Sequence, residues 1–233
     1  MIDILLAGVG GQGTVLAAKV LAQAAQSKGW QVRTAETIGM AQRGGNVTSH
    51  VRMGSNGEAV FSPLITPGTA DIVIALEPGE AARALPFLAP GGVLVTATTA
   101  IQPVTAALSS QPYRAGDVVA ALANSLQAEA SRDQAAGAAI APNAKANTQD
   151  AEAPGVEGYP VPLFVPVDDE ALVREAGASS RKSLNMMLLA VAVAQGRVPL
   201  SIDEVKDAVR ACVKPQFVAM NLAAIDTAVA NFG

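Results

Sequence analysis

Short apolar runs alternate with helical segments along the chain, and glycine, proline or polar residues separate them. Strands are predicted at four of the runs, residues 2–7, 30–35, 70–76 and 91–98, and those at 2–7 and 70–76 have the apolar composition of buried strands. A helix is predicted between the first two of these runs, beginning near Thr14 and stopping at Gly29. A shorter helix is expected at 78–84. Strands and helices in alternation are typical of an α/β fold.

The pattern changes in residues 46–65, where apolar and polar positions alternate with a period of two. Such alternation predicts a strand, and the dipeptide Asn56-Gly57 is a strong signal for a tight turn. We therefore expect a β-hairpin here and a sheet that is mixed rather than wholly parallel. The predicted fold is α/β, a Rossmann-like three-layer α/β/α domain whose mixed sheet includes this hairpin.

The second half of the chain is expected to be mainly helical. One strand is predicted at 162–168, and C-terminal helices are predicted at 168–176, 182–195, 201–213 and 215–231. A further helix is expected at 117–127, followed by residues 128–158, which are rich in Ala, Gly, Asn and Pro. Such a composition buries too little apolar surface to offset the entropy of ordering, so this segment is predicted to be a flexible excursion. Residues 1–233 are expected to form a single domain.

One predicted helix, within residues 183–196, is apolar on nearly every face. This pattern predicts deep burial, in the core or against a partner subunit. Asn185 is its one internal polar residue, and an enclosed amide needs a hydrogen-bond partner. We include Asn185 among the candidate cofactor-binding residues.

Composition then narrows the function. The net charge of −4 argues against nucleic acid as the main partner. The chain has one cysteine, Cys212, and one histidine, His50, which cannot assemble a four-ligand zinc or iron–sulfur site. We expect Cys212 to be a small core residue and His50 to be a strand residue. The absence of a disulfide framework fits a reducing compartment. Neither a leader nor a membrane span is recognisable, so we expect a soluble cytoplasmic protein without a membrane partner.

The first strand leads into a glycine-rich turn. Gly8, Gly10 and Gly13 stand in G-x-G-x-x-G register with Gly11 as an additional glycine, and the predicted helix follows at once. Backbone N–H groups of such a turn, together with the helix N-terminus, are suited to an anion such as phosphate. An acid near the end of the second strand, Glu36, also permits an NAD(P) interpretation. Alternatively, the glycines allow only close packing of strand and helix.

A long polar loop, residues 36–46, follows the second strand. It contains Gln42, Arg43, Gly44 and Gly45. The planar guanidinium of Arg43 is suited to a carboxylate or phosphate ligand. The alternative is a solvated loop that an arginine–carboxylate pair holds in place.

Glycine turn and polar loop together resemble the gamma-type subunit of 2-oxoacid:ferredoxin oxidoreductases, most closely the beta subunit of the indolepyruvate enzymes. The segments that carry the resemblance are GVGGQGTVLAAKVLA, TAETIGMAQRGGNVTSHVRMG, ADIVIALEPGEAARALPFLAPGG, KSLNMMLLAVAVA and KPQFVAMNLAAID. They cover most of the chain outside the Ala-rich segment, which is longer than the resemblance leads us to expect.

The resemblance implies an accessory subunit that is inactive alone. The large partner subunit would hold thiamine diphosphate and [4Fe-4S] clusters, decarboxylate an aryl 2-oxoacid and pass electrons to ferredoxin, and coenzyme A would accept the acyl group. The polar loop is then a contact element for the partner, for the coenzyme A route, or for both. This chain would contribute no catalytic or metal-ligating residue. Its candidate cofactor-binding residues are Gly8, Gly10, Gly11, Gln12, Gly13, Thr14, Gln42, Arg43, Gly44, Gly45 and Asn185.

Two other functions stay open at this point. One is a free-standing NAD(P)-dependent oxidoreductase, for which the glycine turn and Glu36 are the motivation. The other is a non-catalytic module that binds a nucleotide or coenzyme A.

Overall fold

The computed structural model describes residues 1–39, 45–55, 57–101, 113–139, 161–177 and 181–233. Within them, six strands form one sheet in the order β2-β3-β1-β4-β5-β6. The strands are β1 Ile2–Val9, β2 Gln31–Ile38, β3 Asn46–Gly54, β4 Ala70–Ala75, β5 Leu88–Ala97 and β6 Leu163–Val167. Strands β1, β4, β5 and β6 are parallel, whereas β3 is antiparallel to both of its neighbours. The sheet is mixed, as predicted.

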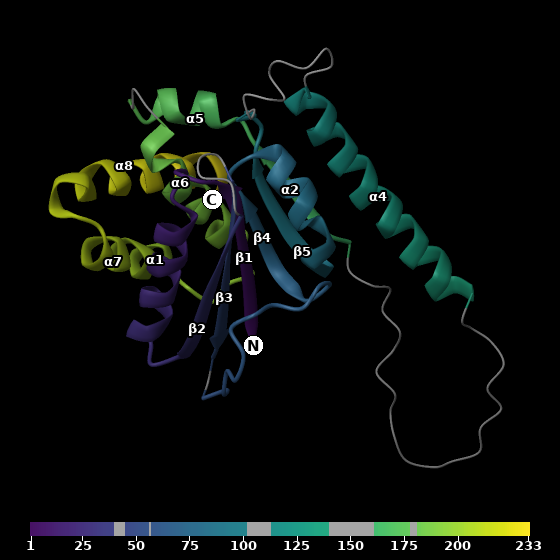
Figure 1. The fold of residues 1–233 in the computed structure, drawn as a ribbon, viewed down its shortest axis with the longest axis horizontal. Coiled ribbons are helices and arrows are strands. Elements are labelled where there is room, and N and C mark those ends of the chain that lie inside the picture. The colour runs from purple at the N-terminus through teal and green to yellow at the C-terminus, as the bar shows by residue number, and fades with distance from the viewer. Residues whose placement is uncertain (40–44, 56, 102–112, 140–160, 178–180) are drawn as a thin grey trace.

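Helices cover both faces of this sheet (Figure 1). They are α1 Thr14–Ser27, α2 Pro78–Ala84, α4 Ala115–Ala139, α5 Asp169–Glu175, α6 Leu184–Ala194, α7 Ile202–Cys212 and α8 Pro215–Phe232. Helices α1 and α6 pack on one face with α7 and α8 behind them, and α2 and α4 pack on the other. The three-layer α/β/α arrangement and the C-terminal helices are therefore confirmed. No helix in the described part of the chain is long and apolar enough to cross a membrane.

The hairpin was predicted in the wrong place. The antiparallel partner of β3 along the chain is β2, which precedes it, with Ala35 opposite His50. After β3, the described residues 57–69 contain no strand. The physical reason is that β3 already pairs with β1 on one edge and β2 on the other. A strand following Asn56-Gly57 would therefore find no free edge of β3 to pair with.

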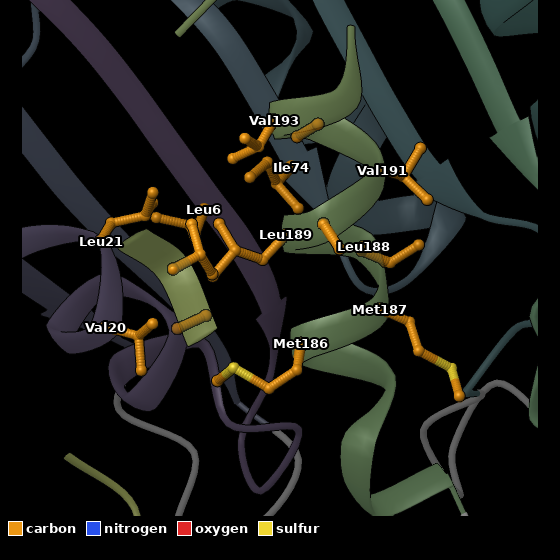
Figure 2. Packing of buried hydrophobic residues seen from close by; sticks show 14 of the residues in the cluster. Leu6, Val20, Leu21, Ile74, Met186, Met187, Leu188, Leu189, Val191 and Val193 are labelled. Carbon is orange, nitrogen blue, oxygen red and sulfur yellow. The ribbon is translucent and has the colours of Figure 1, made fainter. Parts of the chain in front are cut away.

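Helix α6 is buried on all sides, as its composition predicted. Residues Leu184 to Val193 are all buried, and the helix contacts β4, β5, α1, α7 and α8. Figure 2 shows Leu189 reaching towards Leu6 of β1, and Val193 lying beside Ile74 of β4. Full burial of each such side chain contributes about 2 kcal/mol of hydrophobic stabilisation. The helix thus anchors the C-terminal layer on the central strands.

Local signals explain where the last helices begin. Ser201 accepts a hydrogen bond from the Glu204 N–H (3.2 Å) while the Glu204 carboxylate accepts one from the Ser201 N–H (2.7 Å), a capping box that starts α7. Pro215 occupies the first turn of α8, where a missing N–H costs nothing.

Helix α4 is longer than predicted. It was expected over 117–127, but it begins at Ala115 and continues to Ala139, into the Ala-rich segment. Alanine has the highest helix propensity of all residues, so a low content of bulky side chains does not by itself end a helix. The rest of the predicted excursion, residues 140–158, lies outside the described residues.

Candidate functional site

The glycine turn joins β1 to α1 at the carboxyl end of the parallel strands, the edge where α/β sheets bind ligands. It contains Gly8, Gly10, Gly11, Gln12 and Gly13, and Thr14 is the first residue of α1. A Cβ atom at Gly8 would lie 2.9 Å from the Thr14 Cγ2, so glycine lets strand and helix approach closely. Close packing of β1 against α1 is therefore one function of this motif, as the alternative interpretation of the glycines predicts.

Gln12 fixes the shape of the turn. Its Oε1 accepts a hydrogen bond from the Val9 N–H (2.6 Å), and its Nε2 donates to the Leu76 carbonyl (2.7 Å). The side chain thereby connects the ends of β1 and β4. Both polar atoms of the Gln12 amide are thus used in hydrogen bonds to the backbone, and the residue also lines the cleft described below.

Asn185 of α6 supports the turn from the other side. It is 2% exposed, and its Nδ2 donates to the Gly13 carbonyl (3.0 Å). Gly13 has a left-handed backbone (φ +85°), and a Cβ there would come within 2.6 Å of the Asn185 Nδ2. The buried amide thus has the hydrogen-bond partner that the sequence required. Within the described residues its Oδ1 and the Ser183 Oγ are buried without a hydrogen-bond partner.

The polar loop returns to the glycine turn because β3 lies directly beside β1. The Gly10 N–H donates to the Gly45 carbonyl (2.8 Å), so two segments 35 residues apart in sequence meet at this edge. Gln42, Arg43 and Gly44 lie outside the described residues. The topology places Gly45, the described end of the loop, in the site.

The same topology disfavours the dinucleotide interpretation. Glu36 is an exposed residue of β2, and β3 separates β2 from β1. Since neighbouring strands are about 4.8 Å apart, β2 lies roughly 10 Å from the strand that carries the glycine turn. In a dinucleotide-binding fold the acidic strand directly adjoins the glycine strand.

A cleft of about 370 Å³ opens beside the turn. It is lined by Val9, Gly10, Gly11, Gln12, Ile101, Arg181, Lys182 and Leu184. Val9, Ile101, Arg181, Lys182 and Leu184 were not predicted as site residues. The KSLNMM segment contains Lys182 and Leu184, but only the fold reveals that the start of α6 faces the glycine turn.

Arg181 is held at the cleft by a buried carboxylate. Asp169, at the start of α5, is fully buried, and its Oδ1 accepts hydrogen bonds from the N–H groups of Thr98 (3.1 Å) and Thr99 (2.9 Å). Its Oδ2 lies 2.5 Å from the Arg181 Nη2. One carboxylate thus connects the end of β5 with the segment that lines the cleft.

The electrostatic character of the cleft is positive. Among the described lining residues none is acidic and two are cationic: Lys182, and Arg181, whose charge is paired with Asp169 outside the lining. The N-termini of α1 and α6 both lie at this edge, and neither has a side-chain cap. Uncapped N–H groups carry partial positive charge and bind anions. The arrangement is therefore suited to a phosphate-bearing ligand.

A buried carboxylate lies behind the cleft, one residue beyond Leu76. Glu77 is 3% exposed; it accepts the Glu80 N–H (3.0 Å) at the start of α2 and the hydroxyl of Tyr113. Burial raises the pKa of the Glu77 carboxyl, and hydrogen bonds to backbone N–H groups partly oppose this effect. Its contacts make it a helix-capping residue.

His50 and Arg52 lie on β3 opposite Leu5 and Asp3 of β1, away from the glycine turn. The His50 Nδ1 accepts the Ile65 N–H (3.2 Å), and Arg52 pairs with Asp3 (2.9 Å). The expectation of a strand residue at His50 is confirmed. Arg52 pairs in register with Asp3 near the start of β1, far along β3 from the glycine turn.

His50 should make stability depend on pH. Burial lowers the pKa of His50, so the folded state disfavours its protonation. The contribution of neutral His50 to the free energy of unfolding is therefore fully present above the unfolded pKa of about 6.5, and it is lost as the pH falls below that value. His50→Asn retains an acceptor for the Ile65 N–H but does not titrate. Urea unfolding at pH 7.5 and pH 5 should show a larger loss for the wild type than for the variant. Equal losses would contradict a neutral buried His50.

Comparisons with known proteins show the family of this chain. The sequence profile of the pyruvate ferredoxin/flavodoxin oxidoreductase family matches residues 3–231. Indolepyruvate oxidoreductase subunit IorB of Archaeoglobus fulgidus is 30% identical over 224 residues, covering 96% of this chain and 92% of that protein. The pyruvate/ketoisovalerate oxidoreductases common subunit gamma of Thermococcus kodakarensis is 32% identical over 100 residues, 42% of this chain and 52% of that protein.

Solved structures show the same fold. The gamma subunit of a keto/oxoacid ferredoxin oxidoreductase from Geobacter sulfurreducens has a TM-score of 0.60 at 20% identity, over 99% of this chain and 97% of that one. A 2-oxoglutarate:ferredoxin oxidoreductase from Magnetococcus marinus, with 2-oxoglutarate, coenzyme A and succinyl-CoA bound, has a TM-score of 0.60 at 18% identity, over 98% of this chain and 30% of that one. The chain belongs to the pyruvate ferredoxin/flavodoxin oxidoreductase family.

Proposed function

We propose that this chain is the accessory subunit of a 2-oxoacid:ferredoxin oxidoreductase of the indolepyruvate type. In this assignment it supports the oxidative decarboxylation of an aryl 2-oxoacid to an acyl-CoA, with electrons passing to ferredoxin. The similarity to IorB along nearly the whole chain supports the indolepyruvate type, because the similarity to the common gamma subunit covers less than half of it.

The redox cofactors are assigned to a larger partner subunit. An iron–sulfur cluster takes four cysteine thiolates, and this chain has one cysteine, so its residues do not fit a cluster. It also lacks a Gly-Asp-Gly motif for thiamine diphosphate. When bound in the partner, thiamine diphosphate would supply the decarboxylation chemistry. The role of this chain is then to bind and orient the acyl acceptor.

We assign the acceptor, coenzyme A, to the cleft at the glycine turn. The observation that carries this assignment is the convergence of Arg181, Lys182 and two uncapped helix N-termini on one 370 Å³ cleft. Pyrophosphate and phosphate groups need such donors. As proposed from the sequence, the polar loop with Gln42, Arg43 and Gly44 would be a contact element for the partner subunit, for the coenzyme A route, or for both.

Lys182→Gln should weaken coenzyme A binding by about tenfold, because a charge-assisted hydrogen bond contributes about 1.5 kcal/mol. Titration calorimetry on the assembled complex measures the effect. Lys19→Gln is the matched control, since Lys19 is an exposed lysine of α1 beyond the first turn. Equal affinity of the wild type and Lys182→Gln for coenzyme A would contradict the assignment of coenzyme A to this cleft.

Reconstitution separates the subunit from a non-catalytic binding module. The chain and the larger subunit from the same genome, mixed after separate purification, should oxidise an aryl 2-oxoacid in a coenzyme A-dependent reaction that neither component supports alone. Binding of coenzyme A by the chain without association with the larger subunit would instead favour the module.

A further inference from the structure

The strap, residues 57–69, joins the end of β3 to the start of β4 without regular secondary structure. It lies at the end of the sheet opposite the glycine turn, since Met53 near the end of β3 pairs with Ile2 at the start of β1 (Figure 1). Its path is determined by hydrogen bonds. The Val60 N–H donates to the Gln31 Oε1 (3.2 Å), and the Gly68 N–H donates to the Pro86 carbonyl (2.9 Å).

Two residues of β3 hold the middle of the strap. His50 accepts the Ile65 N–H (3.2 Å), and the Arg52 Nη1 donates to the carbonyls of Ser62 (3.2 Å) and Leu64 (3.4 Å). Arg52 is itself fixed by Asp3. The strap is thus attached through its backbone to the body of the protein along most of its length.

The side chains of the strap are arranged in an unusual way for a surface loop. Val60 and Ile65 are buried at 2% and 3% exposure, whereas Phe61 is 92% exposed and Leu64 is 54% exposed. Because buried anchors lie next to both exposed residues, Phe61 and Leu64 cannot turn inward without releasing Val60 or Ile65. Met1, whose Sδ accepts from the Arg52 Nη2 (2.9 Å), adds a third exposed apolar side chain at 44%.

We infer that Phe61, Leu64 and Met1 form a docking surface for the larger subunit of the oxidoreductase. This inference rests on the proposed function. Exposed aromatic side chains held on a rigid backbone are typical centres of protein interfaces, and burial of the phenylalanine alone removes about 200 Å² from water. The partner would present an apolar pocket to the phenyl ring.

A different chain fits this surface better than a second copy. A two-fold dimer requires a self-complementary patch, whereas the strap presents a protruding phenyl ring that needs a concave receptor. Insertion of the ring into a groove elsewhere on another copy would be a heterologous contact, which generates rings or open filaments. Family members carry subunit names, such as subunit IorB, which supports a hetero-oligomeric partner.

The test compares affinities for the purified larger subunit, measured by biolayer interferometry with the full-length chain. Phe61→Ser/Leu64→Ser should weaken binding at least about 30-fold, as expected of an aromatic anchor. Val161→Ser is the control, because Val161 is also about half exposed (49%) but lies beside β6. It should leave the affinity unchanged. Melting temperatures of both variants should stay within about 2 °C of the wild type, since exposed substitutions change stability by about 0.5 kcal/mol.

Unchanged affinity of Phe61→Ser/Leu64→Ser would overturn the docking surface and leave the proposed function intact. A wild-type chain that does not bind the larger subunit would overturn both. Analytical ultracentrifugation of the chain alone should give a monomer. A dimer that dissociates in the Phe61→Ser variant would show that a second copy occupies the surface, and this result would also overturn the inference.

Discussion

Gly13→Ala should lower the free energy of unfolding by about 2 kcal/mol and abolish ligand binding at the glycine turn. A left-handed alanine costs about 1 kcal/mol, and the new methyl group, 2.6 Å from the Asn185 Nδ2, must displace an amide that is buried and hydrogen-bonded to Gly13. Loss of that hydrogen bond adds about 1 kcal/mol. Urea unfolding gives the stability change, and calorimetry with coenzyme A gives the effect on the site.

Gly29→Ala is the matched control for this prediction. Gly29 has nearly the same backbone conformation (φ +78°), but nothing lies within 4 Å of the position its Cβ would take. It should therefore show the conformational cost alone, about 1 kcal/mol, without loss of ligand binding. Equal destabilisation of the two variants would mean that the contact with Asn185 contributes nothing.

A second substitution locates the clash. Asn185→Ala removes the amide but keeps the Asn185 Cβ, which would lie 3.8 Å from the new methyl group, an ordinary contact distance. Gly13→Ala/Asn185→Ala should accordingly be less destabilised than the sum of the single variants. A strictly additive result would contradict a direct contact between the two residues.

The elements of the fold could be predicted because each has a local signal. The apolar run of β1, the glycine stop after α1 and the all-round apolar α6 depend on residues close in sequence. Helix α4 extends beyond the predicted 117–127 because alanine has a high helix propensity even where bulky side chains are few. Composition describes what a segment can bury, and it does not determine the segment's backbone conformation.

Strand pairing and the assembly of the site were harder to predict from the sequence, because they depend on contacts between residues far apart in it. The alternation in β3 is compatible with a partner on either side, and only the assembled sheet shows that β1 and β2 occupy both edges. The glycine turn and Gly45 were both predicted, and their adjacency follows from this order. Arg181 and Lys182 belong to no recognisable ligand-binding motif; they reach the cleft because buried α6 begins there.

Asp169→Asn should lower the free energy of unfolding by about 3 kcal/mol. The substitution preserves the shape of the side chain and an oxygen for the N–H groups of Thr98 and Thr99, but it leaves Arg181 beside a neutral amide. Removing one partner of a buried ion pair costs about 3–5 kcal/mol, and the 29% exposure of Arg181 places this pair at the lower end. Thermal and urea unfolding measure the loss.

Asp168→Asn provides the adjacent control. Asp168 is exposed and accepts the Ala171 N–H (3.0 Å) as the N-cap of α5, a position where asparagine is equally effective. This variant loses the same charge one residue away and should change stability by no more than about 0.5 kcal/mol. Similar losses in the two variants would show that the charge of α5, rather than the pair with Arg181, determines stability.

The double variant Asp169→Asn/Arg181→Gln distinguishes folding from ligand positioning. It removes the unpaired charge, so it should be more stable than Asp169→Asn alone. Its affinity for coenzyme A should nevertheless stay about tenfold or more below that of the wild type, because the cleft has lost a cation that Asp169 holds in place. If stability and affinity recovered together, Arg181 would be a structural residue only, and Lys182 with the helix N-termini would have to bind the phosphates without it.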